Sequence, residues 1–122
     1  MITGRVTSTR EAVIPIAVRG FGPTTEAIDA VVDTGFDGFL TLPRRLVSTL
    51  RLPFGVEAQA VLGNGREVRV DVFEAVVDWD GEQRRVAIVA TAGGALVGMK
   101  MLLGYRLTLD VLDGGPVTIA RI

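Results

Sequence analysis

The residues best suited to chemistry in this sequence lie in one short segment, Val31-Val-Asp-Thr-Gly-Phe-Asp-Gly38. Within it, Asp33 follows two apolar β-branched residues and precedes Thr34 and Gly35. This pattern predicts a buried strand that ends in a tight loop, with the carboxylate at the bend. A carboxylate held there can act as a general acid or base. Because Asp-Thr-Gly occurs once in 122 residues, a site that needs two such acids has to take the second from another chain.

The residue types that are absent narrow the chemistry further. The chain has no Cys and no His, which excludes a thiol nucleophile, a disulfide, thiolate or imidazole metal ligands and a Ser-His-Asp triad. Its two serines, Ser8 and Ser48, are not in a Gly-x-Ser-x-Gly setting. Proton transfer would therefore come mainly from carboxylates, with Tyr105 and Lys100 as more distant candidates.

The acidic and glycine-rich segments do not predict a metal or cofactor site. Asp29, Asp33 and Asp37 would share one face only on a helix, which the Val-Val pair before Asp33 disfavours. The segments Gly20-Phe-Gly22 and Gly63-Asn-Gly65 lack the third glycine of a dinucleotide-binding loop, and no Gly-Lys-Ser/Thr occurs. We therefore expect these glycines to form turns, and we expect neither a metal nor a cofactor.

Length, composition and charge predict one domain over residues 1–122. Hydrophobic residues make up 48% of the chain and charged residues 22%, which suffices for a core. The 14 acids and 13 bases nearly balance and the bases are scattered, so we expect neither nucleic acid nor a membrane as a partner. No stretch reaches the roughly 18 apolar residues of a spanning helix, and no signal-peptide pattern opens the chain. A cytoplasmic location is the default expectation.

The elements that must position Asp33 are mostly strands. Apolar runs between turn residues predict strands over residues 13–18, 26–32, 39–42, 106–112 and 117–122. Two hairpins are predicted, with strands over 57–62, 67–79 and 83–90 and turns at Gly63-Asn-Gly65 and Asp80-Gly81.

Two short helices complete the predicted elements. One covers residues 44–50 and follows Pro43, a residue suited to the first position of a helix. The other covers 96–103 and is entered through Gly98. Many short strands separated by turns favour a mainly β fold, a small closed β-barrel with one or two short helices.

The apolar-apolar-Asp-Thr-Gly segment resembles the active-site loop of retropepsin-like (clan AA) aspartic peptidases. The resemblance continues in the family's order. The Asn-Gly hairpin over 57–72 looks like the flap that folds over substrate. Leu96-Val-Gly98 with residues 99–103 looks like the apolar-apolar-Gly and short helix that support the active-site loop. The stretches 33–43 and 98–110 look like the short, single-domain bacterial members.

This resemblance implies an aspartic endopeptidase that acts as a homodimer on peptides or unfolded proteins. Asp33, Thr34 and Gly35 would form the catalytic loop of each chain, with paired Asp33 carboxylates that activate water and Thr34 joining the two loops. The implied substrate contacts are Gly35, Asp37 and the flap tip, Leu62, Gly63, Asn64 and Gly65.

Two departures from the family's pattern support an alternative. Phe36 follows Asp-Thr-Gly where Ala or Ser is usual. Met99, followed by Lys100, stands where viral members have an Arg that pairs with an Asp placed like Asp37. The alternative is a non-catalytic dimerisation or peptide-binding module with the same fold. A third hypothesis, a small β-barrel with an unrelated ligand, requires an apolar pocket remote from Asp33.

Overall fold

The computed structural model describes the whole chain, residues 1–122, as ten strands and two short helices. The first strands are β1 (Ile2–Val6), β2 (Ala12–Arg19), β3 (Thr25–Val32) and β4 (Leu40–Pro43), followed by helix α1 (Arg44–Thr49). The remaining elements are β5 (Phe54–Val61), β6 (Glu67–Trp79), β7 (Glu82–Thr91), β8 (Leu96–Val97), α2 (Met99–Leu102), β9 (Tyr105–Leu109) and β10 (Pro116–Arg121).

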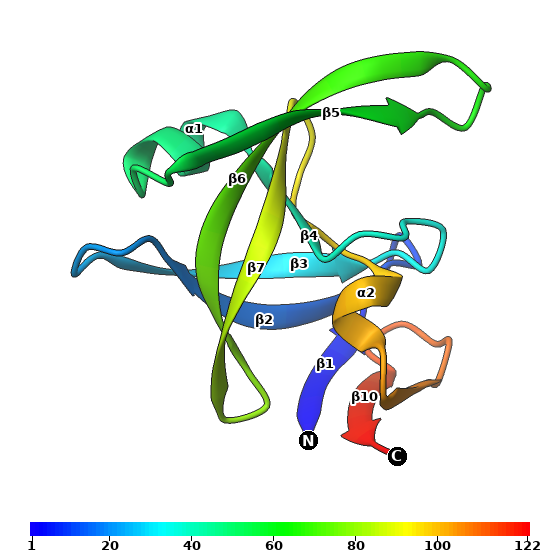
Figure 1. Cartoon of the computed structure of the whole chain (residues 1–122). Coiled ribbons are helices and arrows are strands. Elements are labelled where there is room, and N and C mark those ends of the chain that lie inside the picture. The colour runs from blue at the N-terminus through cyan, green and yellow to red at the C-terminus, as the bar shows by residue number, and fades with distance from the viewer.

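The strands form a single sheet that closes on itself. Their order is β5-β6-β7-β4-β8-β3-β2-β1-β10-β9, and an additional pairing joins β6 to β2. This pairing closes the strands from β6 to β2 into a six-stranded barrel, from which the β5–β6 hairpin projects at the top of Figure 1. The predicted mainly β fold, a small closed barrel with two short helices, is confirmed.

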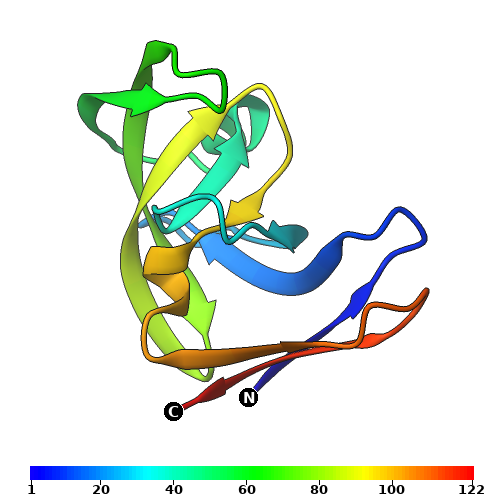
Figure 2. The ribbon, with the colours of Figure 1, turned by 90° about the vertical axis from the view of Figure 1, so that its right-hand side faces the viewer.

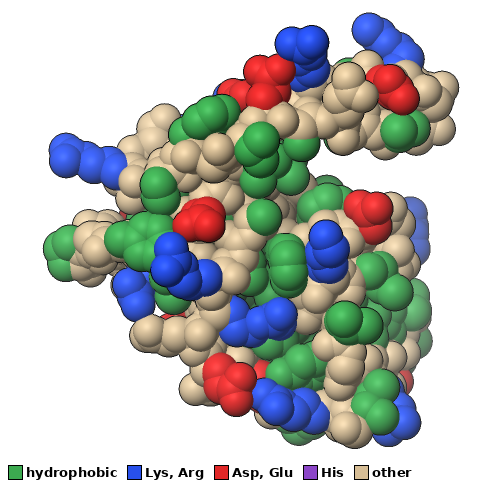
Figure 3. Space-filling model, viewed as in Figure 1, with side chains coloured by type: hydrophobic (Ala, Val, Ile, Leu, Met, Phe, Trp, Pro, Cys, Tyr) green, Lys and Arg blue, Asp and Glu red, His purple; other side chains and the backbone are tan.

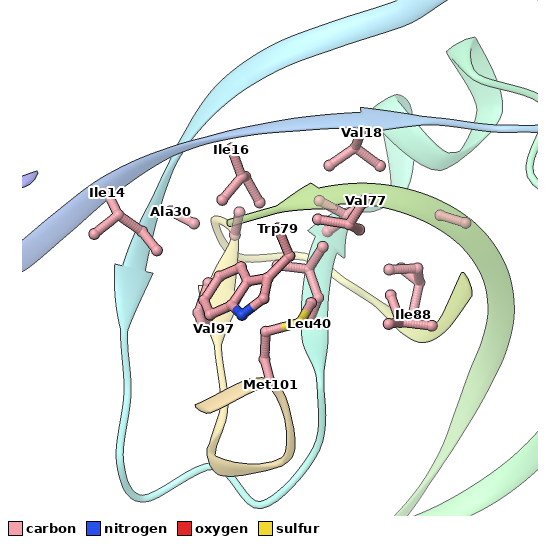
Figure 4. Packing of buried hydrophobic residues seen from close by; sticks show 14 of the residues in the cluster. Ile14, Ile16, Val18, Ala30, Leu40, Val77, Trp79, Ile88, Val97 and Met101 are labelled. Carbon is pink, nitrogen blue, oxygen red and sulfur yellow. The ribbon is translucent and has the colours of Figure 1, made fainter. Parts of the chain in front are cut away.

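The barrel is filled by the apolar side chains that alternate along its strands. On β2, Ile14, Ile16 and Val18 are buried while Pro15 between them is exposed, which is the period-two pattern of a half-buried strand. The core cluster contains 22 buried residues, and Trp79 lies in its middle beside Met101 (Figure 4). Neither helix is long and apolar enough to span a membrane.

β1, β10 and β9 extend the sheet beyond the barrel and bring the two chain ends together. β1 pairs with β10 from Ile2↔Ile119 to Arg5↔Pro116, and both ends of the chain lie at the bottom of Figure 1. There Asp80, in the β6–β7 turn, accepts a hydrogen bond from the N-terminal amine and faces Arg121. The amine's hydrogen bond, with Arg121 and Tyr105, holds the pKa of Asp80 below its ordinary value. The chain ends are thus tied to the β6–β7 turn.

Several predicted boundaries are wrong, including the start of β5, which lies at Phe54 and not at residue 57. Leu96 and Val97 form the strand β8 instead of the first turn of a helix. Pro43 precedes the first residue of α1 instead of occupying it. The strand predicted over 106–112 ends at Leu109, and the chain then turns: the Leu112 N–H donates to Asp110 O and the Gly115 N–H donates to Leu112 O, both at 2.8 Å. Gly115 packs closely against Asp110 O, which is a contact between two segments of the chain. The alternation of side chains within one strand does not predict such a contact.

Candidate active site

The short strand β8 positions the Asp33 loop. β8 lies between β3, with which it pairs in parallel, and β4, with which it pairs antiparallel. The chain therefore leaves β3, turns through residues 33–39 and returns on the other side of β8 as β4. The Asp33 N–H donates to Val97 O at 2.9 Å, so the carboxylate stands where the strand ends, as the sequence predicts.

The loop is then closed by the aspartate itself. Asp33 Oδ1 accepts a hydrogen bond from the Gly35 N–H at 2.9 Å, and the Phe36 N–H donates to Asp33 O at 3.2 Å. These two bonds form a turn in which the short polar side chain bonds to the backbone two residues on. Asp33 is half-buried, while Thr34 and Gly35 are exposed beside it.

The start of α2 supports the same loop from below. The Gly98 N–H donates to Phe39 O at 2.9 Å, and the Met99 N–H donates to Phe36 O at 2.8 Å. A third bond runs from the Lys100 N–H to Gly38 O at 3.1 Å. The carbonyl groups of the loop are thereby satisfied by backbone donors from a segment about 60 residues later, consistent with the supporting role that the resemblance implies.

Phe36 fits this arrangement because glycines surround its ring. A Cβ on Gly98 would lie 2.3 Å from Gly38 O and 2.5 Å from Phe36 Cδ2, and a Cβ on Gly38 would lie 2.5 Å from Phe36 Cζ. Two positions without side chains therefore provide the space that the large residue after Asp-Thr-Gly occupies.

A cleft of about 630 Å³ separates the Asp33 loop from the β5–β6 hairpin. Figure 3 shows this hollow between the projecting arm and the body of the molecule. Nine of its 14 lining residues are hydrophobic. The loop and α2 contribute Gly35, Phe36, Asp37, Gly38, Phe39 and Lys100, and the strands contribute Ala58, Gln59, Ala60, Val61, Val70, Val72, Ala87 and Val89.

The hairpin turn has three residues, and its tip projects past the cleft. The Leu62 N–H donates to Arg66 O at 2.8 Å, and Gly65 has a φ of 83°, a value that glycine adopts without strain. Leu62, Gly63, Asn64 and Gly65 are exposed and none of them lines the cleft in the single chain. Their contact with substrate stays a prediction.

The cleft walls are functional candidates that the sequence analysis did not single out. Ala58 and Ala60 on β5 and Val70 and Val72 on β6 are half-buried, and exposed residues flank the first three on both sides and precede Val72. The alternation along these strands was visible in the sequence. It could have marked one face of the hairpin as apolar, although not as the wall of a cleft.

Asp37 and Lys100 both line the cleft, and neither has an ion-pair partner in the chain. The Lys100 ammonium lies 5.7 Å from the centroid of the Phe39 ring instead of beside Asp37. The cleft therefore carries one acidic and one basic side chain that can contact a bound molecule.

Thr34 faces a separate, smaller hollow of about 300 Å³. Its other lining residues come from α2 and β9 and are mostly apolar: Met99, Leu102, Leu103, Gly104, Tyr105 and Leu107. The Thr34 side chain forms no hydrogen bond within the chain. The exposed hydroxyl next to Asp33 is therefore available to a partner outside the chain.

A hollow that shares no lining residue with the Asp33 loop does not meet the requirement of the third hypothesis. It has a volume of about 540 Å³ and lies between the β2–β3 turn and the end of α1. Only two of its eight lining residues are hydrophobic, whereas small-molecule pockets are mostly apolar.

Comparison with known proteins gives a match in structure, which supports the fold, and no match in sequence. No family model matches the chain, and no curated protein matches it in sequence. Among solved structures, EIAV protease complexed with the inhibitor HBY-793 is similar, with a TM-score of 0.62 and 17% sequence identity. The match covers 84% of this chain and 96% of that chain. The chain thus has the retropepsin-like fold of that aspartic protease.

Proposed function

We propose that this protein is an aspartic endopeptidase that acts as a homodimer and contributes one Asp33 per chain to a shared active site. The observation that carries the proposal is the position of Asp33 in this fold. It stands at the end of β3, bonded to β8, in a loop that forms one wall of an apolar cleft. The similarity to EIAV protease supports the same interpretation at the level of the fold.

Paired carboxylates explain how such a site would hydrolyse a peptide bond. Two carboxyl groups about 3 Å apart cannot both ionise, so they share one proton and titrate as a unit. The ionised member activates a water molecule that attacks the peptide carbonyl. The protonated member donates to the developing oxyanion and later to the leaving amine. This route needs no covalent intermediate, which suits a chain without Cys or His.

The residues around the dyad have distinct proposed roles. Thr34 would join the two loops across the two-fold axis, and Gly35 would accept the substrate backbone. Asp37 and the tip residues 62–65 would contact the bound peptide. The small apolar side chains of the cleft walls suit an extended, unfolded segment with bulky apolar side chains.

A second candidate function is a peptide-binding module without catalytic activity. The specific observation in its favour is that Asp37, which lines the cleft, has no cationic partner in the chain. The same cleft would then hold a peptide without cleaving it.

The test is cleavage of casein by the wild type and by Asp33→Asn. We expect the substitution to lower the rate by about 10²-fold or more, because it removes the general base. Asp29→Asn is the matched control, since Asp29 is an exposed carboxylate on β3 whose only ion pair, with Arg5, is exposed too. This variant should keep the wild-type rate, and sedimentation velocity should show the same dimer for all three proteins.

Equal rates for wild type and Asp33→Asn would end the proposal. Saturable binding of a peptide by both proteins, without cleavage by either, would favour the binding module instead.

A further inference from the structure

Lys100 is the only lysine in the chain, and its side chain reaches the cleft without a neutralising partner. The side chain is exposed, and its ammonium lies 5.7 Å from the centroid of the Phe39 ring. Its backbone N–H is bonded to Gly38 O, which fixes the base of the side chain beside the loop. In Figure 2, helix α2 (orange) lies directly below the loop from β3 to β4 (cyan). The ammonium therefore belongs to the loop side of the cleft.

Arg84, near the start of β7, brings a second positive charge to the same ring. Its guanidinium carbon lies 5.8 Å from the centroid of the Phe39 ring, and its Nη1 donates to Met101 O at 3.4 Å. Glu82, two residues earlier, pairs with Arg121 instead of Arg84. The surroundings of the Phe39 ring thus contain two cations that no carboxylate of the chain neutralises.

The cleft itself offers the Lys100 ammonium few acceptors. Asp37 lines the cleft without forming an ion pair, and Gln59 is the only other lining residue with an oxygen atom in its side chain. A bound peptide displaces the water that solvates the ammonium, and a desolvated charge without a partner costs free energy. The peptide must therefore bring an acceptor, and a carboxylate binds an ammonium more strongly than a neutral group does.

We propose that Lys100 makes the cleft selective for peptides that carry an acidic side chain, aspartate or glutamate, on the side that faces α2. The inference deepens the proposed function, on which it rests, by naming the class of peptide that the same cleft takes. Lys100 is a specificity-determining residue in this proposal, and it takes no part in proton transfer at Asp33.

The opposite wall of the cleft determines which residues flank the acidic one. Ala58 and Ala60 on β5 and Val70 and Val72 on β6 make this wall small and apolar. Successive side chains of an extended peptide point to opposite sides. An acidic residue that faces α2 therefore directs both of its neighbours toward the apolar wall. The preferred substrate is an extended segment with one acidic residue between two apolar ones.

Paired peptides measure this preference on Asp33→Asn, which is expected to bind a peptide without cleaving it. One set of short peptides of alanine, valine and leucine carries a glutamate at each position in turn, and a matched set carries glutamine there. Titration calorimetry gives the affinity of each peptide. We expect the best glutamate peptide to bind about fivefold more tightly than its glutamine counterpart, the effect of a favourable ion pair at a solvent-accessible site.

Lys100→Met, added to Asp33→Asn, removes the charge and keeps an unbranched side chain. It should abolish the difference between the glutamate and glutamine peptides. Arg45→Met in the same background is the matched control, because Arg45 is exposed on α1, forms no ion pair and does not line the cleft. It changes the net charge equally and should keep the difference.

The single lysine also permits a direct observation of the contact. Isotope labelling of lysine alone gives one set of side-chain NMR signals, which all come from Lys100. The signal of the carbon next to the ammonium should shift on addition of the best glutamate peptide and shift much less with its glutamine counterpart. Equal shifts with both peptides would contradict an ion pair at Lys100.

Casein cleavage by the wild type separates the inference from the proposed function. Equal affinities for both peptide sets, or binding of neither, overturn the preference and leave the peptidase standing if casein is cleaved. A preference that Lys100→Met retains overturns the role of Lys100. A preference that Lys100→Met abolishes, without casein cleavage by the wild type, supports this role and overturns the proposed activity. Absence of both peptide binding and casein cleavage overturns both.

Discussion

The contacts that hold the Asp33 loop in place leave no space for a side chain at Gly98. The backbone of Gly98 bonds to Phe39 O, and the space above its Cα is filled by Gly38 O and the Phe36 ring. The φ of Gly98 is −102°, a value that other residues adopt readily, so the requirement for glycine here is one of space and not of backbone conformation.

Gly98→Ala is therefore expected to lower the free energy of unfolding by about 1–3 kcal/mol, the usual cost of forcing atoms into a packed site. It should also lower cleavage, because the Asp33 loop must move to admit the methyl group. Gly94→Ala is the control, since a Cβ there meets nothing within 4 Å. Thermal unfolding measures the stability of both variants, and casein cleavage measures their activity. Equal stability of the two variants would mean that the contacts of Gly98 do not hold the loop.

The sequence predicted Asp33 at a strand end and Gly98 beneath it, but it could not predict how Phe36 is accommodated. Phe36 stands where Ala or Ser is usual, and its neighbours in sequence do not show what surrounds its ring. The structure places it between Gly38 and Gly98, which are 60 residues apart. Thr41 was missed for the same reason: its hydroxyl accepts from the Leu96 N–H at 2.9 Å and fixes β8 from a buried position.

Among the elements, the β5–β6 hairpin decides what the cleft can hold. Residues on β6 alternate between the cleft and solvent, so adjacent positions offer a matched comparison. Val70 lines the cleft opposite Ala58, whereas Asp71 is exposed and has no contact with the cleft.

Val70→Phe should fill part of the cleft and lower kcat/KM for casein by about tenfold or more, while the fold is kept. Asp71→Phe adds the same side chain to the outer face and should leave kcat/KM close to wild type. Steady-state kinetics with circular dichroism of both variants provide the measurement. A loss of similar size in both, or in neither, would show that substrate does not enter between the hairpin and the loop.

Most elements could be predicted because they are encoded locally, in alternating apolar residues and turn-forming pairs such as Asp80-Gly81. The errors fall where distant segments decide the structure. Leu96 and Val97 became a strand because β3 and β4 flank them, and the strand after Tyr105 ended early because Gly115 packs against Asp110. Local sequence patterns do not predict contacts between segments that are distant in the sequence.

At the scale of the whole molecule, the proposed peptidase requires two chains. One chain has one Asp-Thr-Gly, a cleft with one carboxylate loop, and an unpaired β9 edge beside Thr34. In the proposed homodimer, each of these features would supply half of a symmetric site.

Mixing wild-type protein with Asp33→Asn measures this sharing most directly. The amount of wild type is held constant at a concentration where the protein sediments as a dimer, and the variant is added and allowed to exchange. Random pairing in a two-fold dimer predicts about half of the original casein cleavage at equal amounts and about one tenth with a ninefold excess of the variant. An inert protein added at the same concentrations is the control. Cleavage that stays constant as Asp33→Asn is added would show that one chain suffices, and would contradict the shared active site.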